Sequence, residues 1–170
     1  MWDLTVQDDH DFYVESATVV PPSSQEGSTA VPVLVHNCPT GTATYRWDPV
    51  KGHATIQIDM PNGTSRESHQ VVLGENPDGS ATGQPTMGQR VPKEGALGPN
   101  AGEITFDLPD PQAAWDEQTG TLKTDLGPYN IRTNSCITYC VGILRAGGVD
   151  IPEGASGMLV LRSMYRDMYG

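Results

Sequence analysis

Apolar and polar residues alternate along several short segments of this 170-residue chain. The clearest segment is HATIQIDM (53–60), where every second residue from Ala54 to Met60 is apolar. A period of two is typical of a strand with one buried face. Pro61-Asn62-Gly63 then predicts a turn, so that 53–60 and the strand at 68–73 form a hairpin. Further strands are predicted at 43–48 and 103–108.

Helical spacing is strongest from Ser135 to Ala146. Its apolar residues recur every three or four positions, and Gly147-Gly148 ends it; they are Ile137, Cys140, Val141 and Leu144. Asp110–Gln118 predicts a shorter helix, and the tail from Met158 is compatible with a strand or a helix. Residues 74–102 predict a long loop. The expected fold is α+β, with an antiparallel sheet of four to six strands packed on helix 135–146.

The first 38 residues differ from the rest in composition. They contain six acidic residues and no Lys or Arg, and 16–30 is a loop rich in Pro, Ser and Thr. Short strands are predicted within 1–15 and at Val31–Val35. We therefore expect two segments, 1–38 as a small β appendage and 39–170 as the main domain.

The net charge of −11 restricts the partners. Nucleic-acid binding requires clustered Lys and Arg, and anionic membranes also attract basic surfaces, so neither is expected. No apolar run approaches the ~20 residues of a membrane span, which predicts no stable membrane insertion. Met1-Trp2-Asp3 also lacks the basic and apolar regions of a signal peptide. Three cysteines indicate free thiols rather than a disulfide framework.

The segment WDLTVQDDHDFYV…VPVLVHNC resembles the end of a Hint (hedgehog/intein-type) autoprocessing domain, the kind that precedes toxin domains in bacterial polymorphic and Rhs proteins. The resemblance implies a cleavage junction at His36, Asn37 and Cys38. Asn37 would attack its own carbonyl, His36 would protonate the departing nitrogen, and Cys38 would begin the released part. It also implies a toxin domain that is secreted or delivered into a target cell as the C-terminal part of a larger protein, with a cognate immunity protein as partner.

Cys136 lies at the start of the best-predicted helix, where N–H groups and the helix dipole are expected to lower the pKa of a thiol. His53 opens one strand and His69 lies early on the next. A nearby imidazole would supply the base that a cysteine nucleophile requires. Gln57 and Gln70 are alternatives to His69 as the group that orients this base. Cys140, one turn inside the helix, fits a small buried apolar residue.

The order of GHATIQI, His69 and NSCITYC resembles a circularly permuted papain-like enzyme of the NlpC type, similar to the lecithin:retinol acyltransferase-like group. The resemblance covers residues 43–148. It implies Cys136 as nucleophile, His53 as base and His69 as the residue that orients the imidazole. The implied activity is hydrolysis or acyl transfer at a peptide, amide or lipid ester bond, without a cofactor or metal.

Other functions remain open at this point. TATYRWD (42–48) resembles the first strand of some ADP-ribosyltransferase toxins, which would make Arg46 the NAD anchor, with Glu103 or Glu117 as the acid. A non-catalytic binding module would use the 74–102 loop. A zinc site of both helix cysteines and both histidines has weak spacing, and the motif of zinc deaminases is absent.

Overall fold

The computed structural model describes residues 11–15, 32–36, 40–92 and 95–169, and the chain divides into two compact units, Met1–Pro39 and Thr40–Gly170. In the first unit β1 (Asp11–Glu15) pairs antiparallel with β2 (Pro32–His36), and Asp11 lies opposite His36. The strand predicted at Val31–Val35 is therefore present, shifted by one residue. The remaining prediction for 1–10 lies outside the described residues.

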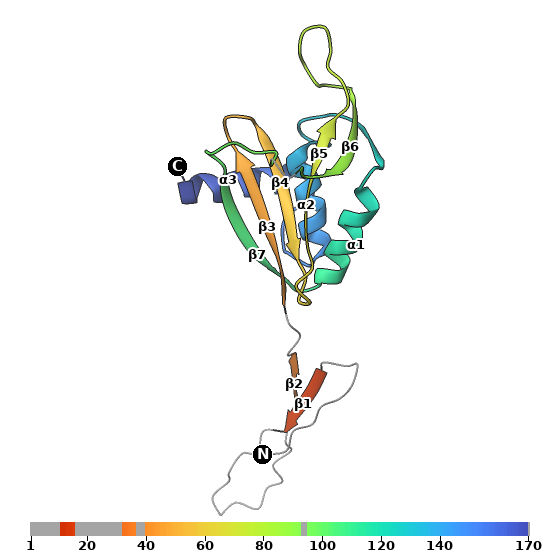
Figure 1. The fold of residues 1–170 in the computed structure, drawn as a ribbon. Coiled ribbons are helices and arrows are strands. Elements are labelled where there is room, and N and C mark those ends of the chain that lie inside the picture. Colours follow the sequence, from red (N-terminus) through yellow and green to blue (C-terminus); the bar gives the residue numbers. More distant parts are fainter. Residues whose placement is uncertain (1–10, 16–31, 37–39, 93–94, 170) are drawn as a thin grey trace, which may run out of the picture. The chain divides into compact units, whose positions relative to one another are not determined.

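The second unit is an α+β fold built on a six-stranded antiparallel sheet. Figure 1 shows the helices α1 and α2 beside the strands of this sheet. The strands lie in the order β7-β3-β4-β5-β6-β8. The elements are β3 (Gly41–Asp48), β4 (His53–Asp59), β5 (Ser65–Val72), β6 (Pro85–Arg90), β7 (Gly102–Leu108), α1 (Pro111–Thr121), β8 (Asp125–Pro128), α2 (Cys136–Ala146) and α3 (Gly154–Tyr169).

One face of the sheet and the three helices enclose the core. On β4 the apolar residues Ala54, Ile56 and Ile58 are fully buried, as the alternation predicts. On the polar face Gln57 and Asp59 are partly exposed, whereas Thr55 is fully buried. The apolar stripe of α2 packs on this face. All four of its predicted apolar residues are buried: Ile137, Cys140, Val141 and Leu144.

Polar side chains attach α1 to the sheet. The Arg66 guanidinium of β5 donates to Gln118 Oε1 at 2.7 Å and to the Trp115 carbonyl at 2.7 Å, and it stacks on the Trp115 ring at 3.9 Å. Gln118 is fully buried, and its amide also donates to Ser68 Oγ at 2.7 Å. Because α1 has little apolar character, these bonds fix its place.

Two strands differ from the sequence prediction. β6 lies within 74–102, which the sequence predicts as a loop, because β6 buries Thr86 and Gly88 rather than an alternating apolar set. β8 is a four-residue Asp-Leu-Gly-Pro segment for which the sequence predicts no element. Gly88 is required by close packing, since a Cβ there would lie 2.3 Å from the Thr121 carbonyl oxygen. The tail is a helix, α3. None of the helices in the described ranges is long and apolar enough to cross a membrane.

Candidate functional site

Cys136 is the first residue of α2, and the local sequence explains why the helix begins there. Ser135 is the N-cap, with its Oγ accepting from the Thr138 N–H while Thr138 Oγ1 accepts from the Ser135 N–H. The backbone N–H groups of Ala54, Ile137 and Cys136 itself act to lower the pKa of the Cys136 thiol. The thiol also lies 3.9 Å from the Gly52 carbonyl oxygen, so it contacts the backbone on both sides of His53.

His53 and His69 form a hydrogen-bonded pair. Ile56 of β4 pairs with Ser68 of β5, which places Thr55 and His69 one step further along the hairpin and His53 diagonally across from His69. His53 Nε2 lies 2.8 Å from His69 Nδ1, and the rings are nearly perpendicular, with an interplanar angle of 73°. The bond uses Nε2 of His53 and leaves its Nδ1 for a further proton transfer.

The thiol and the imidazole line one cavity of about 290 Å³ at the end of the sheet where β4 begins. Strand alternation directs His53 away from the core face, whereas Cys136 arrives on α2 from the core side, and the two meet around this cavity. Within the described residues, no hydrogen bond joins the thiol to either imidazole. The full wall is Gly52, His53, Gln70, Val71, Val72, Ala81, Tyr129 and Cys136.

Burial sets the protonation states of the site. It raises the pKa of the Cys136 thiol, although the three backbone N–H groups act in the opposite direction. The lowered thiol pKa expected from the helix start is therefore wrong: only 8% of the residue is exposed, and desolvation outweighs the dipole. Burial, then His69 and Lys51, lowers the pKa of His53 to about 4. The resting pair at neutral pH is thus a thiol and a neutral imidazole.

A polar network adjoins this cavity. Gln70 Nε2 donates to Thr86 Oγ1 and to Asn134 Oδ1, each at 2.7 Å. Asn134 comes just before the Ser135 cap, so the network connects β5 and β6 to the start of α2. The sequence offers Gln70 as an alternative partner of the base, whereas in the structure its amide nitrogen bonds Thr86 and Asn134. The sequence around Thr86 carried no signal for this role, because β6 was itself unrecognised.

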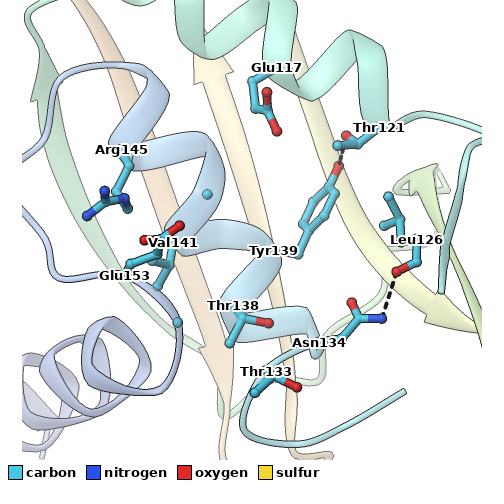
Figure 2. A pocket seen from close by; sticks show the side chains of 12 residues that line it. Glu117, Thr121, Leu126, Thr133, Asn134, Thr138, Tyr139, Val141, Arg145 and Glu153 are labelled. Atoms are coloured by element: carbon cyan, nitrogen blue, oxygen red, sulfur yellow. Dashed lines mark hydrogen bonds between the residues drawn. The ribbon is translucent and has the colours of Figure 1, made fainter. Parts of the chain in front are cut away.

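A second cavity, of about 300 Å³, lies along the other side of α2 (Figure 2). Its charged side chains are Glu117, Arg145 and Glu153, and Arg145 donates to the Ile151 carbonyl at 2.7 Å. Its wall includes no cysteine or histidine.

The other candidate residues lie elsewhere. Arg46 is on β3, where its guanidinium contacts Glu103 at 3.1 Å, Gln57 at 3.0 Å and Glu67 at 3.2 Å. Glu117 lines the second cavity, away from Arg46's partners. Over the ranges that the structure describes, no three His, Cys, Asp or Glu side chains are placed to hold a metal ion.

The predicted cleavage junction is described only in part. His36 ends β2, whereas Asn37 and Cys38 lie outside the described residues. Its chemistry remains a prediction from the sequence.

Comparisons with protein-family models, curated proteins and solved structures found no match to this chain.

Proposed function

We propose that residues 39–170 form a cysteine-dependent hydrolase or acyltransferase. The observation that carries the proposal is one cavity whose wall holds both a thiol at a helix start and the outer member of a hydrogen-bonded histidine pair. Nucleophile, base and orienting residue are the three groups that acyl transfer by cysteine requires. Their side chains come from α2, β4 and β5, and the fold brings them to one end of the sheet.

In the first step, Cys136 Sγ attacks the carbonyl carbon of an amide, peptide or ester, and the thiol proton passes to His53 Nδ1. His69 holds the other side of the His53 ring by accepting from Nε2–H. Because the thiol is neutral at rest, this proton transfer accompanies the attack. The N–H groups at the start of α2, those of Cys136 and Ile137, are the candidate donors that would stabilise the oxyanion.

In the second step, the tetrahedral intermediate collapses and His53 gives its proton to the leaving amine or alcohol. A thioester on Cys136 remains. Water, or an acceptor nucleophile, then attacks the thioester carbonyl and loses a proton to His53 Nδ1, and the thiolate leaves and regains that proton. The cycle needs no cofactor.

We also propose that this enzyme is a toxin domain delivered as the C-terminal part of a larger protein, and that it has a cognate immunity protein. The Hint-like sequence up to His36-Asn37-Cys38 supports this proposal, as does the permuted papain-like order of His53, His69 and Cys136. The division of the chain into units after Pro39 agrees with a toxin that begins near residue 38.

Growth of a bacterial host tests both proposals. The parent chain is induced in the cytoplasm and, in parallel, exported to the periplasm, with soluble yield measured each time. We expect growth arrest in at least one compartment, and its loss in Cys136→Ala and His53→Ala. Cys140→Ala is the matched control, because it removes a fully buried thiol one turn further along the same helix.

The variant Arg46→Ala distinguishes the cysteine-dependent activity from the NAD-dependent alternative, in which Arg46 would anchor NAD. Continued toxicity of Arg46→Ala agrees with thiol chemistry. A toxic Cys136→Ala together with a harmless, soluble Arg46→Ala would overturn the proposed activity. A parent chain that is harmless in both compartments would overturn the toxin proposal. The catalytic proposal would then be tested separately, by incubating the purified protein with p-nitrophenyl acetate and measuring its intact mass for an acyl group on Cys136.

A further inference from the structure

β7 forms one edge of the six-stranded sheet, with β3 on one side and no described strand on the other (Figure 1). It is seven residues long, and its pairing with β3 runs without a Pro, a Lys or a bulge on β7. The outer side of an edge strand carries unpaired N–H and C=O groups, which natural proteins usually protect by such features. The edge of β7 is therefore a candidate for pairing with another chain.

The hydroxyl of Tyr169 shows which backbone groups of β7 point outward. It accepts from the Glu103 N–H at 3.0 Å and donates to the Glu103 carbonyl at 2.9 Å, so these two groups face away from β3. In an antiparallel strand both backbone groups of a residue point to one side, and the side alternates along the strand. Thr105 and Asp107 therefore also direct their N–H and C=O groups outward.

The outward groups of Thr105 and Asp107 are open. Both residues are exposed, and neither N–H nor C=O has a partner beyond β7 among the described residues. The opposite edge of the sheet differs, because β8 has four residues and ends at Pro128. There Asn134 Nδ2 donates to the Leu126 carbonyl at 2.8 Å, which Figure 2 shows, and to the Pro128 carbonyl at 2.9 Å. Of the two edges, β7 is the one that can accept a further strand.

The side chains at this edge are acidic. Glu103 and Asp107 are exposed on the sheet face opposite the core, where β4 and β5 add Asp59 and Glu67. Arg46 is the basic residue that contacts Glu103, at 3.1 Å, and Glu67, at 3.2 Å. Four carboxylates and one guanidinium thus share this part of the face, so basic side chains of an added strand would be attracted there.

A second copy of β7 fits this edge poorly. Antiparallel pairing of two copies about Thr105 would place Glu103 of each copy opposite Asp107 of the other, and like charges directly opposite destabilise a strand pair. On the core side, Phe106 is only partly buried and offers apolar surface to a neighbouring strand. The matching strand therefore alternates basic residues with apolar ones.

We propose that the outer edge of β7 binds an extended segment of another protein by strand addition, and that this segment carries a basic side chain at every second position. Its backbone pairs with Thr105 and Asp107, and its basic side chains lie on the acidic face beside Glu103 and Asp107. The inference is independent of the catalytic proposal, because the described wall of the Cys136 cavity comes from other elements.

A fluorescein-labelled peptide of alternating Lys and Val, as long as β7, tests this binding by fluorescence anisotropy with the full chain. Directly opposed side chains share a face, so the Lys residues beside Thr105 and Asp107 are those whose N–H groups point at β7. N-methylation of the Lys residues should weaken binding at least about tenfold, as for the loss of two hydrogen bonds. N-methylation of the Val residues keeps the same charge and should change the affinity less than about threefold, because those N–H groups point away from β7.

Thr105→Pro tests the same contact from the side of the protein. It removes one outward N–H, whereas the ladder to β3 uses the residues on either side of it. We expect this variant to bind the unmodified peptide at least about tenfold more weakly. Thr105→Ala is the matched control, because it keeps the N–H, and its affinity should change less than about threefold. If Thr105→Pro does not fold, the two methylated peptides on the parent chain decide alone.

Equal affinities for the two methylated peptides would overturn the proposal, because the attraction would then be electrostatic alone. Failure of the unmodified peptide to bind saturably would also overturn it. Analytical ultracentrifugation tests for a second copy at this edge, and a dimer of the parent chain that Thr105→Pro dissociates would overturn the proposal in favour of self-association.

Discussion

His53 Nε2 and His69 Nδ1 lie 2.8 Å apart, which makes the orientation of one imidazole depend on the other. For His53 to accept a proton at Nδ1, its Nε2 must carry hydrogen and His69 Nδ1 must accept. His69 then carries its own hydrogen on Nε2, an atom that is buried without a hydrogen-bond partner among the described residues. Burial lowers the pKa of both rings, and His69 lowers the pKa of His53 further, whereas Glu67 partly offsets the effect of burial on His69.

His69→Ala is expected to lower kcat/KM about tenfold, the effect of losing one orienting hydrogen bond. It should also move the acidic limb of the pH–rate profile upward. Burial, His69 and Lys51 hold the pKa of His53 at about 4, so removing His69 lets that pKa rise towards its ordinary value of 6.5. A full profile of kcat/KM against pH measures both effects.

His69→Asn is the comparison for this prediction, because it can still accept from His53 while carrying no titratable ring. It should retain more activity than His69→Ala. An unchanged acidic limb in both variants would contradict the assignment of His53 as the base.

Stability should decrease as pH falls from about 6.5 to about 4. The folded-state pKa of His53 is below its value of 6.5 in the unfolded chain, so the unfolded state binds more protons in this interval. The contribution of His53 to the free energy of unfolding is therefore fully present above pH 6.5 and is lost as the pH falls towards 4. For this half-buried group the loss is about 2 kcal/mol. Urea unfolding at pH 7.5 and pH 4.5 measures the loss.

His53→Gln removes the titrating group while keeping a polar side chain, and its unfolding free energy should fall less between the two pH values. Parallel losses in the parent and the variant would show that other groups cause the pH dependence.

The rate at which iodoacetamide alkylates Cys136 should keep rising with pH to beyond pH 9, and it should show no plateau near neutral pH. Burial raises the pKa of this thiol, so the reactive thiolate forms only at alkaline pH. Cys140 should stay unmodified in the folded protein, because it is fully buried and its pKa is also raised by desolvation. Peptide mass spectrometry over a pH series separates the two thiols.

A plateau below pH 8 would instead indicate a preformed thiolate–imidazolium pair. In that case His53→Gln would raise the apparent pKa of the thiol, whereas the neutral pair described above predicts no change.

The sequence predicted the parts of this fold that depend on apolar patterning. The alternation of Ala54, Ile56 and Ile58 predicted β4, and the helical spacing after Ser135 predicted α2 within one residue at its start. β6 was missed because its buried positions are Thr86 and Gly88, which are held by hydrogen bonds and close packing rather than by apolar character.

The candidate site, like the fold, was predictable from the sequence only in part. Turn chemistry at Asn62-Gly63 was enough to predict neighbouring strands for His53 and His69, but the register that joins the two rings follows from the packed hairpin. The effect of burial on the Cys136 pKa depends on the strands and helices around it. The position of Cys136 in the sequence indicates that it begins a helix, but it does not indicate how strongly the folded protein desolvates its thiol.

Gln118→Leu should destabilise the fold by at least about 3 kcal/mol, because it leaves the buried Arg66 charge without one of its close partners. Arg66 would keep the Trp115 carbonyl and Thr119 Oγ1, so the protein should still fold. The double variant Arg66→Met, Gln118→Leu should recover part of the loss, since it replaces both polar partners with apolar groups.

Gln112→Leu, the same substitution at an exposed position of α1, should change stability by less than about 0.5 kcal/mol. Urea unfolding of the parent, Arg66→Met, Gln118→Leu, the double variant and Gln112→Leu completes the comparison. A double variant as unstable as the two single losses combined would contradict an attachment of α1 through this pair.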